Sequence, residues 1–140
     1  DTGNGAVLGV PKVRRQDVSH YGIVETQRIA DGLHRIVDLV EKPSPAQAPS
    51  RYAVIGRYVL SPAIFPILER TSPGKNREIQ LTDALRQLAQ EAPSYAKEIA
   101  GQRYDAGDKL GFLPATVEFA LKRPTLGRPF AAYLKQVTRR

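Results

Sequence analysis

Apolar and polar residues alternate through much of the first 60 positions, which is typical of strands that bury one face. The alternating segments are residues 6–13, 21–26, 33–42 and 52–60. Gly32 lies between the second and third segments, so we expect a hairpin there. The prolines in residues 43–50 exclude a helix or an interior strand, because proline donates no backbone hydrogen bond. We therefore expect a loop before the fourth strand.

Helical spacing of apolar residues takes over in the second half of the chain. The expected helices cover residues 62–70, 78–91, 109–122 and 129–137, and short strands are expected at 95–100 and 102–104. Ser61 and Asp108 carry side chains that cap helix N-termini, and residues 16–20 form a polar connection. Strands and helices thus mix without repeats. The fold class we predict is α/β, a mixed sheet with flanking helices.

Length and composition indicate one folded domain. The chain has 140 residues, of which 41% are hydrophobic and 25% are charged, which suits a globular protein with a real core. No apolar run reaches the length of a membrane span and no leader pattern opens the chain, so we expect no membrane contact and a cytoplasmic location. Cysteine is absent, which excludes disulfides and thiolate zinc sites.

The net charge of +7 suits an anionic partner. The basic residues form scattered pairs without the interleaved aromatic residues that stack bases, so a nucleic-acid partner is not favoured. The two histidines, His20 and His34, have no acidic neighbours in the sequence to act with. We expect both of them to be structural or surface residues.

The charged pair Glu41-Lys42 stands at the end of an expected strand, directly before Pro43. Open α/β sheets bind ligands at the carboxyl ends of their strands. A carboxylate there can accept two sugar hydroxyls, and an adjacent ammonium can meet a phosphate. Because strand neighbours point to opposite faces, both side chains serve one ligand only if the backbone turns, and Pro43 offers that turn. The alternative is a solvated charge pair, which spacing alone favours.

Four further residues could contact a substrate. Asp105 and Asp108 lie in a glycine-containing turn, where one carboxylate could bind Mg²⁺ beside substrate phosphates, although helix capping is the simpler role for Asp108. Gly22 could let a sugar approach its backbone amide, or could simply form a tight turn. Gly56, inside an expected strand, marks either a close ligand approach or a bulge.

Six motifs follow one another in an order that a known family shares. They are YGIV, VEKP, YAVIGRYVLS, EIQLTDAL, YDAGDKLGF and LGRPFAAYL, and the match covers residues 1–134. In these motifs the sequence resembles the bacterial UTP:glucose-1-phosphate uridylyltransferases, or UDP-glucose pyrophosphorylases, of the sugar nucleotidyltransferase superfamily. The resemblance implies a nucleotidyltransferase (Rossmann-like) fold. It also implies a Mg²⁺-dependent reaction of carbohydrate metabolism, in which UTP and glucose 1-phosphate give UDP-glucose and pyrophosphate.

The resemblance also implies roles for individual residues. The substrate-binding residues would be Gly22, Glu41, Lys42, Gly56 and Arg57. Among them, Glu41 would hold glucose hydroxyls, Lys42 would contact the sugar phosphate, and Gly22 would offer its backbone amide to the sugar. Gly56 and Arg57 would line or support the sugar pocket. Lys42 and Asp105 would be the catalytic residues through their charge, with Asp105 as one of two aspartates that bind Mg²⁺.

The family's glycine-rich nucleotide-binding loop has no match in this sequence, and neither has the first metal-binding aspartate. The only Gly-x-Gly is Gly3-Asn4-Gly5, with no arginine or lysine directly after it. We therefore expect residues 1–140 to form a single domain, the sugar-phosphate-binding C-terminal half of such an enzyme without its N-terminal half. The alternative is a noncatalytic interaction module that keeps a remnant of the fold. In both cases we expect a homo-oligomer, because half a mixed sheet exposes strand edges.

We predict that the 140-residue chain alone does not catalyse uridylyl transfer. The physical reason is that no segment matches the loop that would hold the triphosphate of UTP. A pyrophosphate-release assay with UTP, glucose 1-phosphate and Mg²⁺ should therefore give the rate of the protein-free mixture. Mg²⁺-dependent turnover by the purified chain would contradict this prediction.

Overall fold

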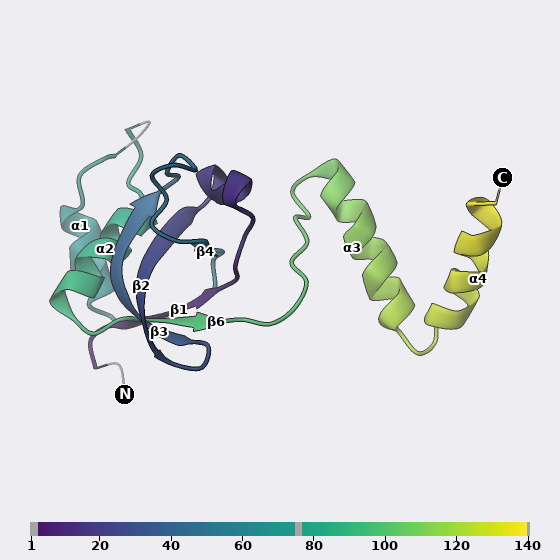
Figure 1. The fold of residues 1–140 in the computed structure, drawn as a ribbon, viewed down its shortest axis with the longest axis horizontal. Helices are drawn as coiled ribbons and strands as arrows, with labels where there is room; N and C mark the ends of the chain where they lie inside the picture. The colour runs from purple at the N-terminus through teal and green to yellow at the C-terminus, as the bar shows by residue number, and fades with distance from the viewer. Residues whose placement is uncertain (1–2, 75–76, 140) are drawn as a thin grey trace. The chain divides into compact units, whose positions relative to one another are not determined.

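The computed structural model describes residues 3–74 and 77–139. The chain forms two compact units, Asp1–Ala100 and Gly101–Arg140, and each is described by itself. The elements of the first unit are β1 (Ala6–Val10), η1 (Arg15–His20), β2 (Gly22–Ala30), β3 (Leu33–Glu41), β4 (Tyr52–Ala53), β5 (Tyr58–Leu60), α1 (Ile64–Arg70), α2 (Leu81–Glu91) and β6 (Tyr95–Glu98) (Figure 1). Those of the second unit are α3 (Lys109–Lys122) and α4 (Gly127–Val137). The role of the whole chain as one sugar-phosphate-binding domain stays a prediction.

The strands of the first unit form one six-stranded sheet in the order β4-β2-β3-β6-β1-β5. β1 pairs parallel with β6, and the other neighbouring strands pair antiparallel. A parallel pair needs a long crossover connection, and the chain between β1 and β6 supplies it with the two helices α1 and α2. The predicted fold class, a mixed sheet with flanking helices, is confirmed.

β2 and β3 form the hairpin that the sequence predicts, with Gly32 in the turn at a φ of 60°. Glycine suits this left-handed conformation because it has no Cβ. Partway along the hairpin the register shifts and skips Val37. Because side chains alternate between the two faces of a strand, one skipped residue brings Ile36 and Leu39 to the same face. Both lie in the main core.

The sheet curls, so that the edge strand β4 meets the segment that follows β1. This segment, residues 11–13, runs beside β4. The Ala53 amide donates to the Pro11 carbonyl at 3.0 Å, and the Val13 amide donates to the Arg51 carbonyl at 2.9 Å. Without these bonds β4 would present unpaired backbone groups on its outer side. The curl therefore protects an edge of the sheet.

Helices α1 and α2 lie against one face of the sheet and cover the main core (Figure 1). Apolar residues recur at helical spacing on α2, so Ala84, Leu85 and Leu88 reach the core from one side of the helix. A smaller cluster is formed by residues of η1, β2, β4 and the proline-rich loop, namely Val18, Ile23, Ala53 and Ala48. Ile23 and Val24 are neighbours on β2 and belong to different clusters, because they point to opposite faces.

Several sequence-based predictions about elements are wrong. Residues 52–60 form two short strands and not one, because Gly56 has a φ of 79° and turns the chain between them. Residues 102–104 form no strand, and residues 15–20 form the 3-10 helix η1 where we expected only a polar connection. Ser61 does not cap α1, since its hydroxyl donates to the Asn4 carbonyl and the helix begins at Ile64.

The second unit is the helix pair α3 and α4. Asp108 caps α3 as predicted, because its Oδ2 accepts a hydrogen bond from the Gly111 amide at 2.7 Å. The connection between the helices is tight at Gly127, where a Cβ would lie 2.3 Å from the Leu121 carbonyl oxygen. Among the described helices of both units, we find none that combines the length and the apolar character of a membrane span.

Candidate functional site

The hairpin of β2 and β3 brings Gly22 and Glu41 together at the end opposite its turn. The two residues are directly across from each other in the pairing. Glu41 follows the core residue Leu39 by two positions, so its side chain leaves the same face of the strand, which α2 covers. There the Thr82 hydroxyl donates a hydrogen bond to Glu41 Oε2 at 2.6 Å. The sequence-predicted acid is thus held by a helix as well as by its own strand.

Gly22 is buried, and the space beside it is already filled. A Cβ at this position would lie 2.7 Å from Thr82 Oγ1 and 3.1 Å from Glu41 Oε2. Both distances are tighter than ordinary van der Waals contact, so a larger residue would have to displace the hydrogen-bonded pair. This close packing is a reason for glycine that the sequence did not indicate. The approach of a sugar to the Gly22 amide stays a prediction.

Lys42 has a left-handed backbone with a φ of 43°. For a residue with a Cβ this conformation costs about 1–2 kcal/mol, and strained residues of this kind cluster at functional sites. The turn brings the Lys42 ammonium to 3.5 Å from Glu41 Oε1, while 50% of the Lys42 side chain stays exposed. The backbone turn that the charged pair requires is therefore made by Lys42 itself. Pro43, to which we had assigned it, is buried directly afterwards.

A cleft of about 250 Å³ opens between the end of β3 and the start of α2. It is lined by Leu39, Val40, Glu41, Gln80, Asp83 and Arg86. Asp38 fixes the guanidinium of Arg86, with an Nε–Oδ1 distance of 2.5 Å and an Nη2–Oδ2 distance of 2.9 Å. Carboxylate, amide and guanidinium groups thus converge on one cleft. The carboxylate and amide oxygens of this lining can accept hydrogen bonds from the hydroxyl groups of a ligand.

Tyr58 on β5 lies within reach of the charge on Glu41. Burial raises the pKa of the Tyr58 phenol, a hydrogen bond from the Gly56 backbone lowers it, and the Glu41 carboxylate raises it further. The phenol is therefore protonated at neutral pH. Gly56 and Arg57 are exposed, and they are not among the described residues that line the cleft. Their predicted contacts with a sugar stay predictions.

Asp105 lies in the second unit, in the turn before α3. Its Oδ1 accepts a hydrogen bond from the Gly107 amide at 3.1 Å, and its Oδ2 lies 3.2 Å from the Arg103 guanidinium. In the described parts of the chain, no group of three or more acidic, histidine or cysteine side chains could hold a metal ion. Mg²⁺ uses one or two protein carboxylates and keeps several waters. Asp105 is exposed and fits this requirement as a single ligand.

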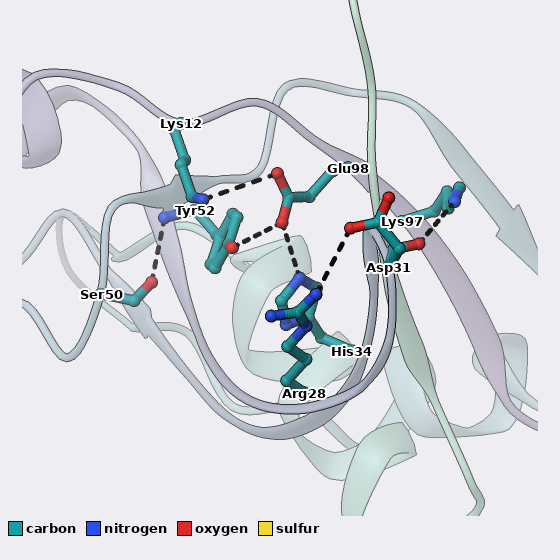
Figure 2. Close-up of polar contacts among 8 residues, drawn as sticks. All are labelled: Lys12, Arg28, Asp31, His34, Ser50, Tyr52, Lys97 and Glu98. Carbon is teal, nitrogen blue, oxygen red and sulfur yellow. Dashed lines mark hydrogen bonds and ion pairs between the residues drawn. The ribbon is translucent and has the colours of Figure 1, made fainter.

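A second polar cluster surrounds Glu98 on β6 (Figure 2). Glu98 Oε1 accepts hydrogen bonds from the Tyr52 hydroxyl at 2.7 Å and from His34 Nε2 at 2.8 Å. Lys12 Nζ lies 3.6 Å from Glu98 Oε2 and also sits over the Tyr52 ring, 5.0 Å from its centroid. These contacts connect the segment after β1 with β3, β4 and β6. We interpret the Glu98 cluster as a clamp that holds the curl of the sheet.

The Glu98 cluster also lowers the pKa of Glu98 and selects the ring nitrogen of His34 that donates. The hydrogen bonds from Tyr52 and His34 lower the pKa of Glu98 from 4.5 to about 2, with Lys12 adding to the effect and burial opposing it. His34 is only 5% exposed. Its Nε2 must carry the proton of this bond, because an ionised carboxylate only accepts. The expectation that His34 is structural fits this position, but its acidic partner, 64 residues away, was not foreseen.

Sequence reasoning missed Thr82, Tyr58 and Glu98. Thr82 lies inside the EIQLTDAL motif, which was noted for its resemblance, but nothing in the spacing links it to Glu41, 41 residues earlier. Tyr58 was read only as part of an apolar strand. For Glu98 the sole local signal was a charged residue near the end of an expected strand, which is common on solvated faces.

We predict that Glu98→Gln destabilises the chain at neutral pH and that its effect fades in acid. Because the folded-state pKa of Glu98 is below its usual value, the carboxylate stabilises the fold above about pH 4.5. That contribution is lost as the pH falls from 4.5 toward 2. Thermal unfolding across this range should show the melting temperatures of wild type and Glu98→Gln converging in acid.

The matched control for this experiment is Glu25→Gln, an exposed glutamate on β2. It should change the melting temperature little at any pH. A constant difference between wild type and Glu98→Gln from pH 7 to pH 2 would rule out the clamp as we describe it.

We predict that Gly22→Ala destabilises the chain by about 1–3 kcal/mol, the usual cost of overpacking a filled site. The added Cβ meets Thr82 Oγ1 and Cγ2, the latter at 3.1 Å. Thr82→Ala removes both atoms, so the double variant should lose less stability than the sum of the two single variants. Urea unfolding gives the free energy of unfolding of wild type, of the two single variants and of the double variant. Additive effects, or a Gly22→Ala variant as stable as wild type, would show that the site is not filled.

Comparison with known proteins finds relatives along nearly the whole chain. A family model described as Nucleotidyl transferase matches residues 2–120. The UTP–glucose-1-phosphate uridylyltransferase YngB of Bacillus subtilis is 47% identical over 134 residues, which cover 96% of this chain and 45% of that protein. The UTP–glucose-1-phosphate uridylyltransferase 2 of Streptococcus pyogenes is 44% identical over 135 residues, with the same two coverages. The chain thus spans about half the length of the curated relatives it matches.

Solved structures share the fold. A UDP-glucose pyrophosphorylase in complex with UDP-glucose matches with a TM-score of 0.80 and 43% identity, over 85% of this chain and 45% of that one. A UTP-bound UGPase from Acinetobacter baumannii matches with a TM-score of 0.80 and 36% identity, over 93% of this chain and 45% of that one. The predicted resemblance to UDP-glucose pyrophosphorylases is therefore confirmed. With sequence and fold in agreement, the chain belongs to the nucleotidyl transferase family.

Proposed function

We propose that this chain binds the sugar-phosphate part of the substrates in the transfer of a uridylyl group from UTP to glucose 1-phosphate, which yields UDP-glucose and pyrophosphate. The observation that carries the proposal is the pairing of Glu41 with Lys42 at the cleft that Glu41 lines, with 3.5 Å between Glu41 Oε1 and Lys42 Nζ. The printed names of the relatives, uridylyltransferases and a pyrophosphorylase in complex with UDP-glucose, support this choice of substrates.

The two charged groups suit the two ends of a sugar phosphate. An ionised carboxylate only accepts hydrogen bonds, so Glu41 is matched to sugar hydroxyls, which donate. Its side chain is 17% exposed, so part of it stays open to a ligand. Lys42 is more open and presents a compact positive charge, which is matched to a phosphate. The 3.5 Å between the two groups would let them hold a sugar and its phosphate side by side.

The reaction places few chemical demands on these residues. A phosphate oxygen of glucose 1-phosphate attacks the α-phosphorus of UTP in line with the leaving pyrophosphate, and this requires positioning and charge neutralisation. Glu41 would orient the sugar, and Lys42 would offset the negative charge of the attacking phosphate. Neither residue acts as a nucleophile or a base in this scheme.

Mg²⁺ would neutralise phosphate charge in this reaction when it is bound. Asp105 would supply one carboxylate to it, because Mg²⁺ usually binds only one or two protein carboxylates and keeps several waters. The Arg103 guanidinium, 3.2 Å from Asp105 Oδ2, opposes a cation at that oxygen. Oδ1, which accepts only a backbone amide among the described contacts, is the better placed donor. Mg²⁺ dependence, a cytoplasmic location and a homo-oligomer all stay predictions.

The test is a ¹⁵N NMR titration of the chain with UDP-glucose, with and without Mg²⁺. We expect shifts at Gly22 and Lys42, and Mg²⁺-dependent shifts at residues 105–107. Hydrogen bonds to charged groups contribute about 1.5–3 kcal/mol. Glu41→Gln and Lys42→Met should therefore each weaken binding by roughly 10-fold to 100-fold.

Two controls make this titration specific. Glu25→Gln and Lys135→Met carry the same chemical changes at exposed positions of β2 and α4, and both should bind UDP-glucose like wild type. The proposal fails if wild type shows no shifts at millimolar UDP-glucose. It also fails if the control variants weaken binding as much as the site variants do.

A further inference from the structure

We infer that Thr82 is a positioning residue, whose hydroxyl holds the Glu41 carboxylate in the orientation that receives the sugar. This inference rests on the proposed function, because it assigns Thr82 a role through Glu41. The Thr82 hydroxyl lies 2.6 Å from Glu41 Oε2, and Thr82 is 7% exposed. Water therefore has little access to the Thr82 hydroxyl and cannot easily replace this hydrogen bond. The bond joins the last residue of β3 to the first turn of α2.

The hydroxyl of Thr82 is used differently from those of other threonines near helices in the described chain. Thr71, Thr116 and Thr138 each donate to the backbone carbonyl four residues earlier. This is the usual partner of a threonine hydroxyl in a helix. Thr82 stands at the start of α2, and it donates to the side chain of another element. Its hydrogen bond therefore orients Glu41 and does not serve its own helix.

Threonine is well suited to this role because its side chain has few rotamers. Two heavy atoms on Cβ make χ1 stiff, so the hydroxyl and the methyl group keep fixed directions. The hydroxyl meets Glu41, and the methyl group Cγ2 lies 3.1 Å from where a Cβ on Gly22 would be. Gly22 therefore leaves room for both groups. The three residues form one packed unit, which we call the Gly22–Glu41–Thr82 unit.

The Gly22–Glu41–Thr82 unit divides the two carboxylate oxygens between separate tasks. Oε2 accepts the internal hydrogen bond from Thr82, while Oε1 lies on the side of the Lys42 ammonium. A carboxylate has about four acceptor positions. Thr82 can therefore fix the plane of the Glu41 carboxylate while other acceptor positions remain for sugar hydroxyls. A group that is held in place before the ligand arrives loses less freedom when the ligand binds. Thr82 thus raises affinity without touching the sugar.

The experiment compares Thr82→Val and Thr82→Ser in the UDP-glucose titration of the full 140-residue chain. Valine keeps the shape of threonine and lacks the hydroxyl, so we expect affinity to fall about 10-fold, in the range of one hydrogen bond to a charged group. Serine keeps the hydroxyl and should restore affinity to within about 3-fold of wild type. The matched control is Thr71→Val, which removes an equally buried hydroxyl bonded to the Ile67 carbonyl. It should leave affinity unchanged.

A double-mutant cycle separates positioning from general stability. In a Glu41→Gln background the oriented carboxylate is already gone, so Thr82→Val should weaken binding much less than it does in wild type. Urea unfolding of every variant shows whether the chain is folded at the titration temperature. If Thr82→Val is unfolded, the affinity of Thr82→Ser still tests the inference, because serine keeps the hydroxyl.

The outcomes distinguish this inference from the proposed function. If wild type does not bind UDP-glucose, the proposed function fails and the inference fails with it. If wild type binds and Thr82→Val binds equally well, only the inference is overturned. It is likewise overturned if Thr71→Val weakens binding as much as Thr82→Val, or if the loss caused by Thr82→Val is the same in the Glu41→Gln background.

Discussion

The register of the β2–β3 hairpin is the constraint on which the candidate site depends. Gly22 lies opposite Glu41 only in this register, which shifts at two places along the hairpin, at Val37 and at Ile29. Because side chains alternate, a slip of one position would send Glu41 to the other face of the sheet, away from α2. The buried Leu39 prevents that slip, since it would leave the core at the same time. Core packing and site geometry are thus fixed by the same pairing.

The helix α2 supplies the side chains that complete the site beside this hairpin. Leu85 and Leu88 dock it on the sheet, and that docking places Thr82 against Glu41 and Arg86 against Asp38. The cleft then forms between the end of β3 and the start of the helix. Elsewhere in the sheet, the Glu98 cluster and the backbone hydrogen bonds between residues 11–13 and 51–53 stabilise its curl. The position of the site and the curl of the sheet therefore depend on two separate sets of contacts.

The sequence predicts the parts of this structure that depend on near neighbours. The hairpin around Gly32 and the Asp108 cap are both local, and both are confirmed. The break at Gly56 was missed, because a glycine with a positive φ and a glycine in a bulge look alike in a sequence. The partners of Glu41 and Glu98 lie 41 and 64 residues away, so only the folded chain could reveal them. Glu41 and Lys42 were recognised through a motif, while the turn at Lys42 needed the structure.

We propose a Gly22–Glu41–Thr82 unit that is formed before the ligand arrives and receives the sugar through Glu41. The most direct measurement is a crystal structure of the chain soaked with UDP-glucose beside one without it. We expect the Glu41 carboxylate to contact sugar hydroxyls while its 2.6 Å hydrogen bond with Thr82 is the same in both structures. A sugar bound away from Glu41, or a Glu41 side chain that leaves Thr82 in order to reach the sugar, would contradict it.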